Sequence, residues 1–345
     1  MSRGTEPDVS IVTRWTHKLE GARSMSSTAP VARVAVVIPC YKQAHFLGDA
    51  IESTLKQTMP PSEVVVIDDG SPDDVLGVVS RFPGVRYIRQ RNQGLSAARN
   101  TGIRATNSEL LVFLDSDDRL LPHAIERGVV HHYRHPDCGF VAGRMHTIAA
   151  DGSLMHRWKP FPVTNDNLAQ LLINHCGIYP LTVMYRRAAI EKVGGGFNTS
   201  LRSAEDWDMD IRLARHFPFH LYDEPIAEYR KHGSNMTGNA PVMMKSIIGV
   251  LRAHRSLTRS RPHLEPARRQ GIARVHNYFT ELVITQIHTD IAEHRWAAAL
   301  EKSWTLLRWH PHVVVERVGM KIEKLTSARG QHDGRETAAV KRPAH

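Results

Sequence analysis

Short runs of apolar residues alternate with amphipathic stretches from about Val31 onward, and this rhythm predicts repeated β-α units. Four runs have the length of buried strands and are bounded by turn formers: 33–39, 63–67, 85–88 and 110–114. Between them, residues 44–57 and 94–105 carry apolar side chains at helical spacing. The pattern indicates an α/β fold, Rossmann-like, with a mostly parallel central sheet.

The rhythm changes after about Cys138. Residues 139–148 and 154–158 flank Asp151-Gly152, which predicts a hairpin, and helices are expected near 167–174 and from about Ala204. Beyond Gly233 the chain becomes basic and helical in pattern, with paired amphipathic helices at its end. The predicted layout is a disordered tail at 1–30, a main α/β domain at 31–235 with halves 31–120 and 121–235, a basic helical extension at 236–325 and a polar tail at 326–345.

Composition excludes several broad classes of protein. With 41% hydrophobic and 23% charged residues, the 345-residue chain can bury a core and is not disordered throughout. Three scattered cysteines provide no disulfide framework. No apolar run approaches the roughly 18 residues that span a bilayer, and the first thirty residues lack a signal-peptide core. We therefore expect a cytoplasmic protein, and whether translation starts at Met1 or Met25 stays open.

Charged residues follow the predicted strands at the points where they end. Asp68-Asp69 closes the second strand, and Asp115-Ser116-Asp117-Asp118 closes the fourth. In a parallel sheet these ends share one edge, where ligands bind. Clustered carboxylates repel, so the pattern favours a divalent cation, Mn²⁺ or Mg²⁺, held together with a substrate diphosphate. Asp118 is expected to cap the helix that follows.

Seven motifs, taken in order, resemble those of the family 2 glycosyltransferases, which have the GT-A fold. They are Val37-Ile38-Pro39-Cys40-Tyr41-Lys42, Val66-Ile67-Asp68-Asp69-Gly70-Ser71, Gly94-Leu95-Ser96-Ala97-Ala98-Arg99-Asn100, Phe113-Leu114-Asp115-Ser116-Asp117-Asp118, Gly195-Gly196-Phe197-Asn198, Glu205-Asp206-Trp207-Asp208 and Tyr229-Arg230-Lys231-His232. The resemblance runs from about Val34 to His232. It implies a nucleotide-binding first half and a second half that holds the acceptor and the catalytic base.

The resemblance also implies roles for individual residues. Those expected to bind the nucleotide are Pro39, Tyr41, Asp68, Asp69, Arg99, Asn100 and Asp115. Those expected to hold the metal in a DXD-type site are Asp115, Asp117 and His232, and those expected around the donor and acceptor sugars are Gly196, Glu205 and Trp207. Structural alternatives remain open for Arg99 on a solvent-exposed face, His232 after a strand and Trp207 in a core.

Asp206 is the candidate catalytic base. A carboxylate within hydrogen-bond reach can take the proton of an attacking hydroxyl, while a metal stabilises the departing diphosphate. One base and one metal imply an inverting transfer from a nucleotide sugar, with UDP favoured by the resemblance, to a glycan or lipid-linked acceptor. The alternative for Asp206 is a charge that complements the helix start. The alternative functions are a sugar-phosphate nucleotidyltransferase and a non-catalytic relative that binds sugar or nucleic acid.

A net charge of +10 suggests anionic partners, and seven arginines but one acid lie in the range Arg252–Arg274. This range is either a solvated helical face or a peripheral contact with anionic lipid at the inner face of the membrane. Nucleic acid is disfavoured because no aromatic residues interleave with the arginines. Five apolar residues near the end are expected to pack onto the main domain or a second subunit: Trp296, Leu300, Trp304, Leu307 and Trp309. The histidines show no zinc-type spacing such as HExxH, so no zinc site is expected.

Overall fold

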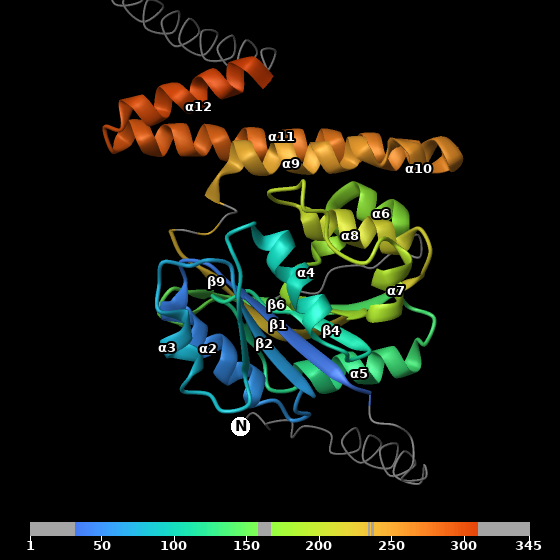
Figure 1. The fold of residues 1–345 in the computed structure, drawn as a ribbon. Helices are drawn as coiled ribbons and strands as arrows, with labels where there is room; N and C mark the ends of the chain where they lie inside the picture. The colour runs from blue at the N-terminus through green and yellow to red at the C-terminus, as the bar shows by residue number, and fades with distance from the viewer. Residues whose placement is uncertain (1–31, 158–166, 234, 236–237, 310–345) are drawn as a thin grey trace, which may run out of the picture.

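The computed structural model describes residues 32–157, 167–233, 235 and 238–309 (Figure 1). Within these residues a sheet of nine strands is covered by helices on both faces. The predicted tails at 1–30 and 326–345 lie outside the described residues. The predicted boundary at residue 235 falls between the last strand and the first of the C-terminal helices.

The first half of the sheet is built from the four predicted strands. They are β1 (Val34–Cys40), β2 (Glu63–Asp68), β3 (Arg86–Arg89) and β4 (Leu110–Phe113). All neighbouring pairs are parallel, in the order β3-β2-β1-β4. Every residue of β1 is buried, as expected of a parallel strand with helices on both faces. The strand predictions are confirmed to within two residues at each end.

Alternating residues of β1 enter two different apolar clusters. Val36 and Ile38 face the cluster that contains helices α2 (Ala44–Leu55) and α5 (Ala124–Arg134), with α3 (Val75–Val79) beside α2. The intervening residues, Ala35 and Val37, face the opposite cluster. That cluster is closed by α4 (Leu95–Ala105), α7 (Arg187–Lys192) and α8 (Glu205–Ala214).

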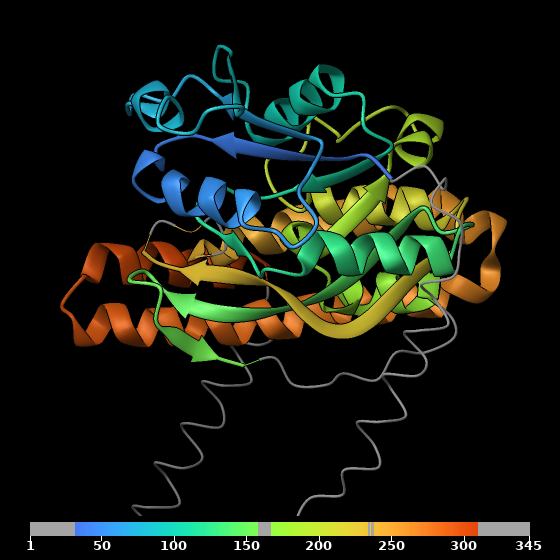
Figure 2. The same ribbon diagram turned by 90° about the horizontal axis from the view of Figure 1, so that it is seen from below.

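The second half of the sheet is mixed. Its strands are β5 (Arg119–Leu120), β6 (Phe140–Ala149), β7 (Leu154–His156), β8 (Val183–Arg186) and β9 (Phe219–Lys231). β8 lies antiparallel between β4 and β6, and β6 pairs in parallel with β9, which runs beside it in Figure 2. The predicted β6–β7 hairpin is confirmed. Because β1, β2, β4, β6 and β9 all run the same way, their carboxyl ends share one edge of the sheet.

The C-terminal helices form a layer on the side of the sheet that carries α4 and α8 (Figure 1). They are α9 (Ala240–Ala253), α10 (Arg255–Ser260), α11 (Glu265–Ala292) and α12 (Trp296–Trp309). Apolar residues of α9 and α11 share one buried cluster with α8 and with α6 (Asn167–Asn174). A Cβ on Gly271 would collide with the Leu172 carbonyl, so a glycine is needed where α11 meets α6.

Of the two packing partners expected for the C-terminal tryptophans, the main domain is wrong for Trp296 and Trp304, and a second subunit stays a prediction. α12 packs against α11, which confirms the expected helix pair. However, Trp296, Leu300 and Trp304 are 57%, 70% and 68% exposed, so they do not pack onto the main domain. They recur every four residues along the outward face of α12 and form an apolar stripe there. No helix among the described residues combines the length and the apolar character needed to cross a bilayer.

Candidate active site

Most of the predicted site residues lie at or next to the carboxyl edge of the sheet. Tyr41 follows β1, Asp68 ends β2, and Asp115 stands two residues beyond β4. His232 follows β9 directly. Because these strands are parallel, residues far apart in sequence meet at one edge, as the strand-end pattern predicts.

Arg99 of α4 joins two carboxylates of this edge. Its side chain is fully buried, and its guanidinium donates to Asp115 Oδ1 and Glu205 Oε1, each at 2.7 Å. The solvent-exposed alternative for Arg99 is therefore wrong. The two charge-assisted hydrogen bonds fix the start of α8 against the loop that follows β4. Glu205 lies in the interior at this contact, beside the candidate base.

The acidic edge has more carboxylates than nearby cations. Burial raises the pKa of Asp115; the Arg99 guanidinium opposes the shift, and the charges of Asp117 and Asp206 add to it. Burial likewise raises the pKa of Glu205, against the opposing effect of Arg99. Arg99 thus lies among four carboxylates, an arrangement that a further cation would stabilise. The four are Asp115, Asp117, Glu205 and Asp206.

Asp117 lies beside the end of β9. Its Oδ2 is 2.8 Å from His232 Nε2, and Asn235 Nδ2 lies 3.4 Å from the same oxygen. The His232 ring also packs near Phe46 of α2, with ring centroids 5.0 Å apart. The structure therefore brings together two residues that are 115 positions apart and that the sequence assigns to one metal site.

Asp118 is not a helix cap, and that prediction is wrong. Its Oδ1 accepts the backbone N–H of Arg230 at 2.8 Å, and β5 separates it from α5, whose N-cap is His123. Arg230, to which the sequence analysis gave no role, is buried and donates to the carbonyls of Asp117 and Ala150, each at 2.8 Å. Its position within the Tyr-Arg-Lys-His motif was the available signal. Arg230 thus locks the acidic loop to β9.

Asp206 stands in the first turn of α8, directly after Ala204, whose backbone is left-handed at φ +60°. Its side chain is half-buried, and within the described chain it has no hydrogen bond or ion pair. Its negative charge contributes to raising the pKa of Asp115, His175 and Tyr179, which places it among them. A carboxylate in this state is open to accept a proton from a bound molecule.

A buried network behind Asp206 escaped the sequence analysis. His175 Nε2 lies 2.8 Å from Asp210 Oδ2, and the Tyr185 hydroxyl donates to Asp210 Oδ1 at 2.9 Å. Burial lowers the pKa of His175, but the hydrogen bond to Asp210 and the charges of Asp206 and Asp210 outweigh it, so the net shift is upward. The signal for Asp210 was its position one helical turn after Asp206; His175 had no comparable signal.

Trp207 belongs to the core rather than to an open sugar site. Its side chain is 6% exposed and lies in the cluster shared with the C-terminal helices. Its indole N–H donates to the Leu171 carbonyl at 2.9 Å, and one ring face stacks on His175 with centroids 4.9 Å apart. Trp207 therefore touches the site through His175.

An exposed aromatic ring lies where the sequence predicts that the nucleotide binds. Tyr41 is 42% exposed, whereas Pro39 before it is buried in β1. Lys42 has a left-handed backbone at φ +58°, and its Nζ lies 5.2 Å from the Tyr41 ring centroid. The turn after β1 thus presents a ring and an ammonium group together, a pair suited to a base and a phosphate.

Asp68 and Asp69 are both buried and already hydrogen-bonded. Asp68 accepts the Tyr87 hydroxyl at 2.6 Å, and burial together with this carboxylate raises the pKa of Tyr87 to about 12. Asp69 accepts the backbone N–H groups of Gln93 and Gly94 at 2.9 and 2.8 Å. Both side chains therefore shape the loops around the candidate nucleotide site.

Asn100 and Gly196 form one contact. The Asn100 amide donates to the Phe197 carbonyl at 2.8 Å and accepts the Phe197 N–H at 2.7 Å. A Cβ on Gly196 would collide with the Asn100 amide, so the approach requires glycine there. Both residues hold the loop before α8 in place, and this contact occupies both polar groups of the Asn100 amide.

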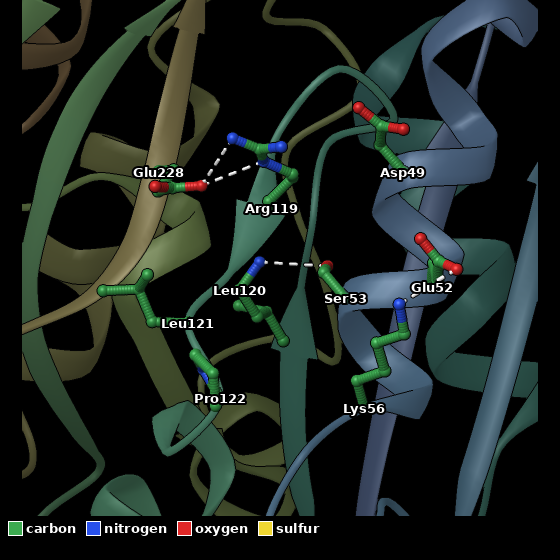
Figure 3. A pocket seen from close by; sticks show the side chains of 9 residues that line it. All are labelled: Asp49, Glu52, Ser53, Lys56, Arg119, Leu120, Leu121, Pro122 and Glu228. Carbon is green, nitrogen blue, oxygen red and sulfur yellow. Dashed lines mark hydrogen bonds and ion pairs between the residues drawn. The ribbon is translucent and has the colours of Figure 1, made fainter. Parts of the chain in front are cut away.

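A separate hollow of about 330 Å³ opens between α2 and β5 (Figure 3). Asp49 lines it and also accepts from the Arg230 guanidinium at 2.7 Å, so the hollow borders the acidic loop. On its other wall Arg119 pairs with Glu228 at 2.9 Å. The predicted site residues do not line it.

The fold and the acidic edge define a protein of the GT-A class. The fold is similar to that of the crystal structure of S. aureus TarS residues 1–349 in complex with UDP-GlcNAc, with a TM-score of 0.53 and 22% identity over 64% of this chain and 65% of that one. It is also similar to the mannosyltransferase PcManGT of Pyrobaculum calidifontis in complex with GDP-Man and Mn²⁺, with a TM-score of 0.55 and 16% identity over 88% of this chain and 89% of that one. At these identities the likeness establishes the fold alone.

The sequence comparisons point to one family. The profile described as "Glycosyl transferase family 2" matches residues 35–194. Chondroitin synthase of Escherichia coli is 30% identical over 59% of this chain and 30% of its own length. An uncharacterised glycosyltransferase of Nostoc sp. is 30% identical over 59% of this chain and 66% of its own length. These matches support a family 2 glycosyltransferase, and the chain spans less than two thirds of the length of either relative.

Proposed function

We propose that this protein transfers a sugar from a nucleotide-sugar donor to a hydroxyl acceptor, with inversion at the anomeric carbon. The observation that carries the proposal is the half-buried carboxylate of Asp206, which has no hydrogen-bond or ion-pair partner among the described residues and is held beside Asp115 by the Arg99–Glu205 contact. The match to glycosyl transferase family 2 supports it. The acceptor is a glycan or a lipid-linked sugar in the synthesis of a polysaccharide.

Asp206 is the general base of the proposed reaction. The acceptor hydroxyl loses its proton as its oxygen attacks the anomeric carbon, and a carboxylate within hydrogen-bond reach takes that proton. Asp210 holds His175 beside Asp206, and Glu205 anchors the helix turn that carries it. We therefore treat His175, Asp210 and Glu205 as positioning residues.

The donor atoms of the acidic edge fit a divalent cation. Arg99 occupies only Oδ1 of Asp115, and the neighbouring Asp117 Oδ2 lies 2.8 Å from His232 Nε2. Two carboxylates with one imidazole suit Mn²⁺ or Mg²⁺, and we propose that Asp115, Asp117 and His232 hold the ion. When bound, it would neutralise charge on the leaving diphosphate.

A UDP-sugar is the proposed donor. TarS was crystallised with UDP-GlcNAc and the Pyrobaculum enzyme with GDP-Man and Mn²⁺, so both nucleotides occur on this fold. The exposed Tyr41 ring is placed to stack on the base, with Asp69 and Asp68 shaping the adjoining loop. Pro39 lies one residue inside the strand from Cys40 and supports this turn.

The first alternative function, a nucleotidyltransferase, finds no support in the family match. The second alternative, a non-catalytic relative, is disfavoured by the retention of Asp115, Asp117 and Asp206 around one edge. Neither alternative explains a carboxylate at the start of α8 that has no partner in the part of the chain that the structure describes.

A peripheral contact with anionic lipid is part of the proposal. Within the basic range, Arg252, Arg255, Arg259 and Arg274 are exposed, while Arg268 pairs with Glu265 at 2.7 Å and is buried. The exposed Trp and Leu stripe of α12 is the kind of surface that inserts at a headgroup boundary. A cytoplasmic location at the inner face of the membrane stays a prediction, and nucleic acid is not a proposed partner.

The test is a donor panel with water as the acceptor. The purified protein is incubated with Mn²⁺ and, separately, UDP-glucose, UDP-GlcNAc, UDP-GalNAc and GDP-mannose, and release of the nucleoside diphosphate is measured. Proton NMR then reads the anomeric configuration of the first-formed sugar. We expect one α-linked donor to be cleaved to the β-sugar. Release of the α-sugar would contradict inversion, and release from no donor, repeated with added acceptor oligosaccharides, would contradict the proposed reaction.

A further inference from the structure

Three histidines converge at the end of the sheet opposite the acidic edge. His131 lies in the last turn of α5, His135 follows it by four residues, and His220 is the second residue of β9. One ring nitrogen from each lies within 4.8 Å of the others. The sequence expectation of no zinc-type spacing overlooked the His131–His135 pair, and the third histidine comes from a distant strand.

This cluster is separate from the proposed active site. β9 begins at Phe219, beside His220, and ends at Lys231, next to His232. The three histidines therefore stand at the amino end of the strand, and the acidic residues stand at its carboxyl end. α5 packs against both β6 and β9 at this place. A ligand bound here would join a helix to the sheet and would not touch the donor.

The ring nitrogens are in a state that can bind a metal. Nδ1 of His131 is buried and, within the described chain, has no hydrogen-bond partner. Burial, followed by neighbouring positive charges, lowers the pKa of His131 and His220 to about 4, so both rings are neutral at pH 7. Neutral imidazole is the form that coordinates metals. The buried Nδ1 of His131, which lies beside two other imidazoles, could therefore accept a cation or a hydrogen-bond donor.

The geometry requires adjustments before one ion can bind. Zn–N bonds of about 2.0–2.1 Å put the ligand atoms of one ion at most about 4.2 Å apart. The rings of His135 and His220 are stacked at 3.8 Å between centroids, and His131 stacks on Tyr222 at 4.0 Å. To bind one ion, the nitrogens would have to move from within 4.8 Å to within about 4.2 Å of one another, and the His135 and His220 rings would have to turn out of their stack.

The surroundings also select the kind of ion. The cluster contains three nitrogens and no carboxylate, which favours Zn²⁺, Ni²⁺, Cu²⁺ or Co²⁺ over Mn²⁺ and Mg²⁺. Two nearby arginines would repel a bound cation only weakly. Arg127 is paired with Glu224 at 3.1 Å, and Arg134 is exposed, so that solvent screens its charge. Three protein ligands leave a further position for water.

We propose that His131, His135 and His220 form a second metal site, which binds a divalent transition-metal ion such as Zn²⁺ and ties α5 to the start of β9. It is independent of the glycosyltransferase proposal, because its ligands take no part in the proposed reaction.

The test is a Zn²⁺ titration against a competing chromophoric chelator, with excess Mg²⁺ present to saturate the acidic edge. The proteins are the wild type, His220→Gln and His135→Gln, with two controls. His123→Gln changes an exposed histidine at the other end of α5, and Asp117→Ala disables the acidic edge. Co²⁺ absorption supplies a direct spectrum of the ligand set, and thermal melting without metal verifies that each variant is folded.

We expect one Zn²⁺ site in the wild type, in His123→Gln and in Asp117→Ala, and affinity lowered more than tenfold in His220→Gln and His135→Gln. Zn²⁺ should raise the melting temperature of the first three proteins only. Equal affinity in all five proteins, or loss of the site in Asp117→Ala alone, would overturn the proposal. Absence of tight binding in the wild type would show a metal-free stack of aromatic rings and would overturn it as well.

Discussion

The two ends of the same sheet have opposite chemistry. At the carboxyl end, the buried Arg99 holds carboxylates of the loop after β4 and of α8, and the buried Arg230 bonds the backbone carbonyl of Asp117 in the same loop. At the amino end, neutral imidazoles of α5 and β9 lie together without a carboxylate among them. The parallel strands bring distant residues together at both ends. The difference teaches that the sheet brings distant residues together, while the side chains at each end decide which ion can bind.

The largest expected effect concerns Asp206. Asp206→Asn removes the proposed base, so transfer should fall by on the order of 10²–10⁴ while donor binding survives. Asp137→Asn makes the same chemical change in an exposed residue near the amino end and should leave the rate unchanged. Steady-state kinetics with calorimetric donor binding checks both variants. If Asp206→Asn lost donor binding in place of rate, Asp206 would belong to the donor site and not to the base role.

Arg99→Met should have the next largest effect, this time on stability. It leaves Asp115 and the buried Glu205 without their shared cation, and an uncompensated buried charge costs about 3–5 kcal/mol of the free energy of unfolding. Arg104→Met alters an exposed arginine of the same helix and should cost under about 1 kcal/mol. Urea unfolding at pH 7 measures both. Equal costs for the two variants would mean that the carboxyl end does not depend on the Arg99 bridge.

A smaller expected effect, on the pH dependence of stability, distinguishes the amino end of the sheet from the carboxyl end. The pKa of His220 is lowered to about 4 in the folded protein, below its usual 6.5, because of burial and then the neighbouring histidines. As the pH falls, the unfolded chain therefore binds a proton at His220 before the folded protein does. The free energy of unfolding is at its full value above pH 6.5 and decreases as the pH falls toward 4. His220→Gln should flatten that part of the pH dependence in metal-free buffer. An unchanged slope between pH 6.5 and 4 would contradict the half-buried, neutral imidazole of His220.

The smallest expected effect is a pH dependence of stability that has the opposite sign. The pKa of His175 is raised, because the Asp210 hydrogen bond and the charges of Asp206 and Asp210 outweigh burial. Its contribution to stability is complete below pH 6.5 and is lost as the pH rises through the raised pKa. The difference in unfolding free energy between wild type and His175→Gln should therefore shrink with rising pH. A difference that grows with pH would remove the Asp210 contact as its cause.

The sequence predicted what depends on local pattern. Apolar runs place β1, β2, β3 and β4 to within two residues, and the acids at the ends of β2 and β4 meet because those strands are parallel. The prediction that Asp118 caps a helix failed because it assumed a partner nearby in the sequence. The Asp118 carboxylate instead accepts the backbone N–H of Arg230, 112 positions away. A helix start was expected where β5 intervenes.

Long-range partners could not be read from spacing. Glu205 is 106 residues from Arg99, and no local feature of the sequence indicates that the two side chains pair. His131 and His135 show a helical interval in the sequence, but His220 joins them only once β9 lies beside α5. The exposed Trp296 and Trp304 look like core residues by pattern because amphipathicity does not say whether a partner covers the apolar face.

The most direct test of the account is calorimetric titration of UDP, GDP and dTDP into wild type and Asp117→Ala, each with Mn²⁺ and with EDTA. The account predicts that one nucleotide, with UDP expected, binds the wild type only when Mn²⁺ is present and does not bind Asp117→Ala. Binding that is indifferent to EDTA and to Asp117→Ala, or no binding of any diphosphate, would contradict a metal-dependent nucleotide site at the carboxyl end of the sheet.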